Sequence, residues 1–310
     1  MAGYGLSTLV TPLFALSTSP AWVLVARFLD RIGKGVRVSP RNALVADVTP
    51  ITQRGAAYGL RQSLDTIGAF LGPLIATALL FLSAQNFRLV FWCAVLPGII
   101  AIALLVFGVQ EPPQVSKAKP NPLQWSALKS LGKNYWMLVV VALLFNLGNS
   151  SDAFLLLRAQ QTGIATSLIP LSFVVMNITY GLSAYPIGVL SDRIGRLGLL
   201  IAGFTLFAFV YLGLALAQTP WQIWGLFALY GLYLGKTQGL LLALVADQVP
   251  NNLRGTAFGL INLVTGVAIL PASLLAGILW QKVGYQATFM LGSVLAITAI
   301  LVLVLGFRYK

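Results

Sequence analysis

The stretch ALVADVTPITQRGAAYGL at residues 43–60 recurs as ALVADQVPNNLRGTAFGL at residues 243–260, without a gap and with most positions identical. The same offset of 200 residues also pairs single residues: Gly3 with Gly203, Pro20 with Pro220 and Gly35 with Gly235. Repetition at a fixed offset indicates that two parts of a chain share one structural unit. The sequence therefore predicts two related halves.

The composition indicates whether these halves lie in water or in a membrane. Hydrophobic residues make up 58% of the 310 residues and charged residues 9%, whereas a soluble protein carries about 25% charged residues. So few charges cannot cover the surface of a soluble protein of this size. This disfavours the alternative that the apolar segments are helices buried in one large globular domain. The chain is expected to be an integral membrane protein whose partner is the lipid bilayer.

Residue types also exclude functions. The chain has no histidine and a single cysteine, Cys93, which excludes histidine-dependent catalysis and disfavours haem and transition-metal sites. It lacks the G-x-x-x-x-G-K-[ST] pattern that binds ATP phosphates. Basic residues outnumber acidic ones 20 to 7, but without the basic runs typical of nucleic-acid binding. No enzymatic activity, metal, cofactor or nucleic-acid partner is expected.

Apolar segments near the length of a membrane helix, about 20 residues, follow one another along the whole chain. They lie at residues 1–17, 20–46, 55–83, 87–109, 135–158, 166–190, 197–217, 221–246, 255–281 and 285–307. The proline-rich, lysine-bearing stretch 110–134 predicts a cytoplasmic linker. The expected domains are an N-terminal membrane half at 1–109 and a C-terminal half at 135–310.

Lysines and arginines concentrate in one set of predicted loops, which positions that set in the cytoplasm. These are Arg54, Lys117, Lys119, Lys129, Lys133, Arg193, Arg196, Arg254, Arg308 and Lys310, against Arg88, Arg158 and Lys282 on the other side. We expect a multi-pass protein located in a bacterial inner or plasma membrane. Equivalent segments lie six spans apart, so the two copies cross in the same direction, as a parallel repeat.

The first half holds four predicted spans and the second half six. The sequence thus predicts a twelve-span arrangement of which this chain carries ten, with the first two helices lacking.

Three motifs resemble those of the major facilitator superfamily. Residues 188–196, GVLSDRIGR, are similar to its GxxxDRxGR loop in the second-half position. Residues 27–35 resemble its fourth-helix pattern, and residues 68–76 its fifth-helix GxxxGPxxG pattern. Leu197 and Ala76 depart from the usual final residues of the loop and of the fifth-helix pattern. The resemblance implies an all-α helix bundle with two parallel-repeat halves, which rock about a substrate site near the bilayer midplane.

The loop motif implies a cytoplasmic gate. By resemblance, Asp192 would dock on the helix that begins at Gly55, because a helix N-terminus carries free N–H groups and partial positive charge. Its arginines could pair with carboxylates such as Asp247. The gate candidates are Gly188, Asp192, Arg193, Gly195, Arg196, Asp47, Arg54, Asp247 and Arg254. The alternative for the arginines is simple anchoring on the positive side of the membrane.

Six charged side chains fall on one face of the segment 20–46: Arg27, Asp30, Arg31, Lys34, Arg37 and Arg41. A lysine or arginine that faces lipid at the helix centre costs roughly 3 kcal/mol, so these groups are expected to face protein or water. They suit a cavity for an anionic or polar substrate. One alternative is that they form fixed ion pairs with neighbouring helices. Another is that residues 30–46 form an amphipathic helix in the cytoplasm. The remaining cavity candidates are Arg61, Asp65, Asn149, Asn177, Tyr180 and Lys236.

Asp152 is the candidate for proton coupling. Without histidine a proton carrier in the membrane must be a carboxylate, and Asp152 has no basic residue within a turn on its own segment. The alternative is an aspartate hydrogen-bonded to serines for packing.

Together these features predict a monomeric secondary transporter of a small polar or anionic solute, with alternating access. Its energy would come from an ion gradient, with proton-coupled efflux as the candidate mechanism, or from the gradient of the solute itself. An inactive truncated paralogue or a helper membrane protein is the alternative.

Overall fold

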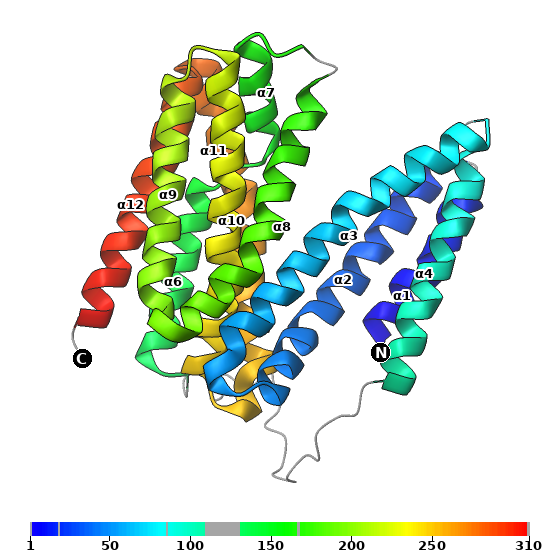
Figure 1. Cartoon of the computed structure of the whole chain (residues 1–310), viewed down its shortest axis with the longest axis horizontal. Helices are drawn as coiled ribbons and strands as arrows, with labels where there is room; N and C mark the ends of the chain where they lie inside the picture. Colours follow the sequence, from blue (N-terminus) through cyan, green and yellow to red (C-terminus); the bar gives the residue numbers. More distant parts are fainter. Residues whose placement is uncertain (1, 18, 85, 109–130, 166–167, 309–310) are drawn as a thin grey trace. The chain divides into compact units, whose positions relative to one another are not determined.

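The computed structural model describes residues 2–17, 19–84, 86–108, 131–165 and 168–308, which form helices joined by short turns (Figure 1). The helices are α1 (Ala2–Ala15), α2 (Pro20–Val48), α3 (Arg54–Leu82), α4 (Phe87–Gly108), α6 (Lys133–Gly148), α7 (Ala153–Gln161), α8 (Ile169–Ile194), α9 (Arg196–Leu216), α10 (Pro220–Gln248), α11 (Arg254–Lys282) and α12 (Tyr285–Arg308). Short 3-10 turns precede α3 and α11.

Within the described ranges, eight helical segments are long and apolar enough to cross a membrane. They correspond to the predicted spans from 55–83 onward, so the protein is an integral multi-pass membrane protein. The first two predicted spans differ in character. Helix α1 is 14 residues long, and α2 carries the six charged side chains along its 29 residues.

Contacts divide the chain into two compact units. The first unit contains α1, α2, α4 and the part of α3 from Gly68 onward. The second contains residues 49–67, which include the first half of α3, and helices α6 to α12. The predicted membrane halves at 1–109 and 135–310 follow the repeat rather than this grouping and stay a prediction. Residues 110–130 of the predicted linker 110–134 lie outside the described residues.

The 200-residue repeat is visible in the packing inside each unit. In the first unit α1 packs on α2 and α4, and in the second α9 packs on α10 and α12. Pro20 and Pro220 begin the equivalent helices α2 and α10, where the fixed backbone angle of proline suits the first helical turn. The two halves therefore share local structure as well as sequence.

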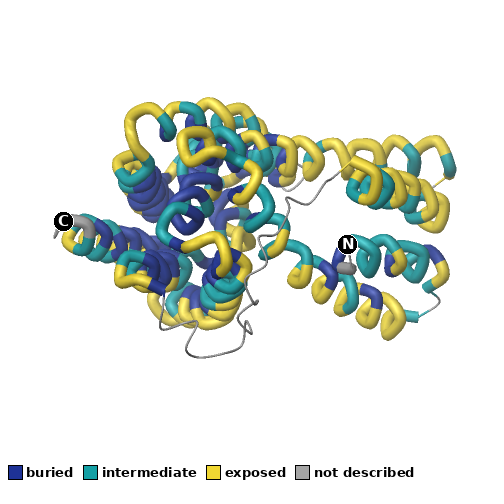
Figure 2. The backbone as a smooth tube through the Cα atoms, turned by 90° about the horizontal axis from the view of Figure 1, so that it is seen from below, coloured by how far each residue is buried: buried dark blue, intermediate teal, exposed yellow. Residues whose placement is uncertain are grey.

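The core of the second unit is aromatic. Phe204, Phe207 and Tyr211 of α9 are almost completely buried, as are Phe227 of α10 and Phe289 of α12. Figure 2 shows buried segments of these helices turned toward one another, with exposed residues on the outside. A bundle with an apolar exterior as well as an apolar core is what a bilayer requires, since lipid contributes no polar partners.

The predicted span over 135–158 corresponds to the apolar segment Lys133–Gln161, but the helix within it is interrupted, which the sequence did not predict. Helix α6 ends at Gly148, and α7 begins at Ala153. Asn149, Ser150, Ser151 and Asp152 fill the break. The side chains of asparagine, serine and aspartate compete with the backbone for hydrogen bonds and disfavour a helix interior. Helix breaks of this kind are typical of binding sites in transporters.

Candidate functional site

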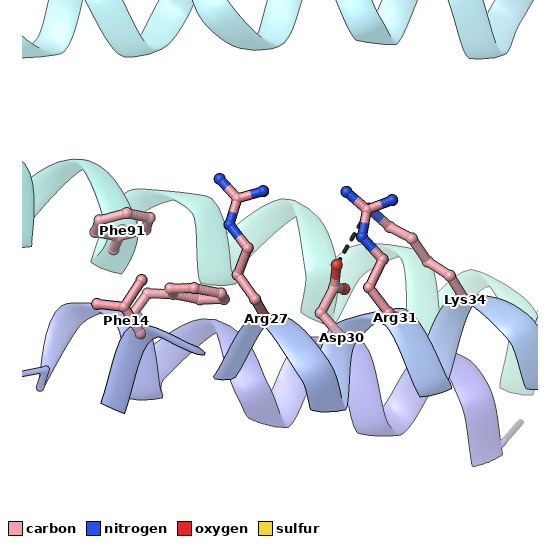
Figure 3. A pocket seen from close by; sticks show the side chains of 7 residues that line it. Phe14, Arg27, Asp30, Arg31, Lys34 and Phe91 are labelled. Atoms are coloured by element: carbon pink, nitrogen blue, oxygen red, sulfur yellow. Dashed lines mark ion pairs between the residues drawn. The ribbon is translucent and has the colours of Figure 1, made fainter. Parts of the chain in front are cut away.

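The first candidate site is a pocket in the first unit, formed by α1, α2 and α4. It has a volume of about 230 Å³ and is lined by Phe14, Val23, Arg27, Asp30, Arg31, Lys34 and Phe91. The charged residues recur every three or four positions of α2, so the helical period brings them to one face. In Figure 3 the side chains of Arg27, Arg31 and Lys34 all extend to the same side of α2.

Only one ion pair in the described chain involves the charges of this pocket. Lys34 Nζ lies 3.1 Å from Asp30 Oδ2, one helical turn away. Arg27 and Arg31 have no carboxylate at ion-pair distance among the described residues, and both are exposed. The pocket therefore offers two guanidinium groups that a solute can reach.

The other two predicted charges of α2 do not line the pocket. The guanidinium of Arg37 lies 4.8 Å from the centroid of the Tyr4 ring, which is a cation–π arrangement. Arg41 lies half-buried one turn further along. The predicted cationic face is thus divided between a pocket and a contact of α2 with α1.

The second candidate site joins the start of α3 to the last turn of α8, within the second unit. Asp192 Oδ1 accepts a hydrogen bond from Gly55 N at 2.9 Å, and Asp192 Oδ2 accepts one from Ala56 N at 2.8 Å. Both donors belong to the first turn of α3, where N–H groups lack intrahelical partners. The structure thus shows the contact that the loop motif predicts.

Arginine side chains extend this contact into a network. Arg196 donates to Asp192 Oδ1 at 2.7 Å and also pairs with Asp247 at the end of α10. Arg54 pairs with the same Asp247, at 2.9 Å. The side chains of Arg54, Asp192 and Arg196 are less than 10% exposed, so water screens these pairs less than it screens surface pairs.

Glycines allow the two helices to approach. A Cβ on Gly188 would lie 2.3 Å from the carbonyl oxygen of Gly55, and one on Gly59 would lie 2.4 Å from that of Ala184. Gly195 connects α8 to α9 with a φ of 99°, a conformation that glycine adopts without strain. The glycines of the motif therefore have distinct steric roles at this crossing.

We expect Gly55→Ala to destabilise the protein and Gly255→Ala, its counterpart in the repeat, to be harmless. A Cβ at Gly55 would meet the carbonyl oxygen of Gly188 at 2.6 Å and Asp192 Oδ1 at 2.8 Å, whereas nothing lies within 4 Å at Gly255. Overpacking costs about 1–3 kcal/mol. Melting temperatures of the two purified variants in detergent should differ by several degrees, and equal values would contradict the close approach.

The third candidate site lies at the break between α6 and α7. Tyr230 of α10 donates to Asn149 Oδ1 at 3.1 Å or to Asp152 Oδ1 at 3.2 Å. Tyr211 of α9 approaches Asn149 Oδ1 at 3.4 Å. Ser151 Oγ accepts from Ala153 N. In the part of the chain that the structure describes, no basic side chain pairs with Asp152, and the side chain that donates to it is a tyrosine rather than a serine.

Sequence reasoning missed the tyrosines and Arg158. Arg158 of α7 is buried; its guanidinium donates to Leu214 O at 2.9 Å and to Ala217 O, and lies 3.7 Å from the centroid of the Tyr285 ring. It fastens α7 to the C-terminal end of α9 and the start of α12. A lone arginine near a predicted loop carries no signal that separates this role from membrane anchoring.

The remaining predicted residues are placed as follows. Arg61 and Asp65 form the expected pair on α3, at 3.9 Å, and buried Tyr180 of α8 lies beside Gln62 and Thr66. Asn177 donates to Phe173 O of its own helix. Lys236 is half-buried on α10 and packs by its Cβ against Gly203.

The other predicted gate residues are Arg193, Asp47 and Arg254. Arg193 is exposed, and the described residues include no ion-pair partner for it. Asp47 lies exposed in the last turn of α2, and Arg254 begins α11 and is buried.

Comparison with known proteins agrees with the fold and the loop motif. The sequence profile of the Major Facilitator Superfamily matches residues 1–160 and 152–310. An uncharacterised MFS-type transporter of Methanocaldococcus jannaschii is 34% identical over 308 residues, covering 97% of this chain and 76% of the relative. The multidrug resistance protein MdtG of Enterobacter lignolyticus is 25% identical over 261 residues, covering 80% and 61%.

Solved structures share the architecture at lower identity. The fucose:proton symporter FucP of Escherichia coli superimposes with a TM-score of 0.79 at 14% identity, covering 98% of this chain and 82% of that one. The human organic anion transporter MFSD10 gives a TM-score of 0.71 at 22% identity, covering 97% and 75%. These likenesses show the fold.

Proposed function

Because this chain belongs to the major facilitator superfamily, a family of secondary transporters, we propose that it carries a small organic anion across the membrane by alternating access. The observation that supports an anion is the pocket on α2, where Arg27 and Arg31 have no ion-pair partner among the described residues. Guanidinium groups bind carboxylates and phosphates through paired hydrogen bonds. The similarity of fold to an organic anion transporter points the same way.

The proposed gate is the network of Asp192, Arg196, Arg54 and Asp247. Its hydrogen bonds to the first turn of α3 are made by charged, mostly buried groups, each worth about 1.5–3 kcal/mol. A contact of this strength can hold α3 against α8 in one state and release it in another. Closure of the cytoplasmic side is the role we propose for it.

The proposed coupling ion is the proton, carried by Asp152. This carboxylate lies at a helix break, accepts a hydrogen bond from Tyr230 and has no cation paired with it in the described chain. A carboxylate without a bound cation can take up and release a proton with little rearrangement. Similarity to a multidrug resistance protein supports export of the solute, and exchange for protons is the coupling that we propose.

A monomer in a bacterial inner or plasma membrane is the proposed working form, with the bilayer, the solute and protons as its partners. The alternative, an inactive paralogue or helper protein, predicts that the pocket binds no solute.

The test is solute binding and uptake with Arg31→Gln and a matched control. We expect Arg31→Gln to weaken binding of small organic carboxylates about fivefold, because an exposed charged contact is worth about 1 kcal/mol. Arg88→Gln removes the same charge from an exposed position in α4 outside the pocket and should leave binding unchanged. Equal affinities in the two variants, or no uptake by the unaltered protein in proteoliposomes, would argue against anion transport through this pocket.

A further inference from the structure

The pocket on α2 has two chemically different ends. At one end Phe14 of α1 and Phe91 of α4 stack, with ring centroids 5.6 Å apart and planes 18° from parallel. At the other end lie Asp30, Arg31 and Lys34, and Arg27 stands between the two ends (Figure 3). A ligand that contacts the whole pocket must therefore carry an anionic group and a flat apolar group.

The charges of the pocket do not cancel. Arg27, Arg31 and Lys34 face a single carboxylate, Asp30, which is engaged by Lys34. Two guanidinium groups one turn apart thus remain for one anionic group of the ligand. Guanidinium is the side chain best suited to a planar carboxylate, because its N–H groups can donate two parallel hydrogen bonds.

The aromatic end is accessible, and the pocket is small. Phe14 and Phe91 are both half-buried, so part of each ring is open to a ligand. Aromatic rings prefer offset-stacked or edge-on contacts with a further ring. The whole pocket has a volume of about 230 Å³, below the 300–1,000 Å³ typical of drug-sized sites, which favours a small ligand.

We propose that this pocket binds a small aromatic carboxylate, with its ring against Phe14 and Phe91 and its carboxylate on Arg27 and Arg31. The inference rests on the proposed transport of an organic anion and adds the aromatic ring as the feature that the protein selects. An aliphatic anion of the same size satisfies the arginines but loses the ring contact.

The test compares benzoate with cyclohexanecarboxylate, which has the same charge at neutral pH and a similar size but no aromatic face. Radiolabelled benzoate is bound to the purified full chain in detergent, and each unlabelled anion competes with it. We expect benzoate to compete about three- to tenfold better, the range that an aromatic contact supplies. This comparison uses the unaltered protein and does not depend on the folding of a variant.

Two variants then assign the preference to the pocket. In Phe14→Leu the ratio of the affinities for benzoate and cyclohexanecarboxylate should fall close to one. The affinity for cyclohexanecarboxylate itself should change little. Phe28→Leu replaces a phenylalanine of α2 that is exposed and outside the pocket, and should keep the preference. Loss of the preference in Phe28→Leu as well would overturn the assignment to Phe14 and Phe91.

The outcomes separate this inference from the proposed function. Equal competition by the two carboxylates overturns the aromatic selection and leaves anion transport standing. Failure of every carboxylate to bind overturns both. Inorganic phosphate that competes as well as benzoate also overturns the aromatic selection. So does displacement of benzoate by phosphatidylglycerol vesicles but not phosphatidylcholine vesicles, which would identify the pocket as a site for anionic lipid.

Discussion

Asp192→Asn is expected to open the contact between α3 and α8 and raise access to the buried surface between them by about 10- to 100-fold. The carboxylate receives two backbone N–H groups of α3 and the guanidinium of Arg196. An amide keeps one acceptor oxygen but loses the charge, and hydrogen bonds to charged groups contribute about 1.5–3 kcal/mol. Since each 1.4 kcal/mol changes an equilibrium constant tenfold, the open population should rise by that factor.

The measurement is cysteine labelling from the cytoplasmic side in a Cys93→Ser background. Ser63→Cys is the reporter, because the Ser63 hydroxyl is buried and donates to Gly181 O of α8 at 2.7 Å. Gly198→Cys is the control reporter, since Gly198 is exposed with nothing close to it. It should label equally with and without Asp192→Asn. Unchanged labelling at Ser63→Cys would show that Asp192 does not hold the gate closed.

Asp152→Asn is expected to abolish accumulation of solute driven by a pH gradient while sparing exchange of solute. Asparagine has nearly the same shape as aspartate and can still accept a hydrogen bond from Tyr230, but it cannot bind or release a proton. Exchange of solute on the two sides needs the conformational change without net proton movement. Both rates are measured in proteoliposomes with the same labelled solute.

Two further variants sharpen this test. Asp152→Glu restores a carboxyl group and should recover part of the gradient-driven accumulation. Tyr230→Phe removes the hydroxyl that approaches Asp152 and Asn149, and should alter the pH dependence while leaving accumulation measurable. Accumulation at the unaltered level in Asp152→Asn would exclude Asp152 as the proton carrier. Loss of exchange together with accumulation would indicate a structural role instead.

Most of the helix positions could be predicted because they depend on properties that a bilayer imposes locally. Apolar runs near 20 residues and short connectors with proline give spans whose ends lie within a few residues of the observed helices. The loop at 188–196 and its contact with Gly55 could also be predicted. This contact followed from the resemblance of the loop to a family motif, because the residue types of the loop do not identify the helix that Asp192 meets.

The break after Gly148 was missed because its four polar residues lie inside an otherwise apolar run. A hydropathy pattern averages over such a short interruption. Whether asparagine and serine end a helix depends on partners elsewhere, here Tyr211 and Tyr230 from α9 and α10. Those tyrosines carry no local signal, since in sequence they resemble any aromatic residue of a membrane helix.

The sequence alone was sufficient for the membrane environment and the repeat, since hydropathy and a recurring 18-residue stretch are properties of the chain itself. The partners of each charge were decided by packing. Arg27 and Arg31 line a pocket, Arg37 stacks on Tyr4, and Arg158 fastens three helices. These arginines look alike in sequence, because the energy of a charge depends on the groups that surround it in three dimensions.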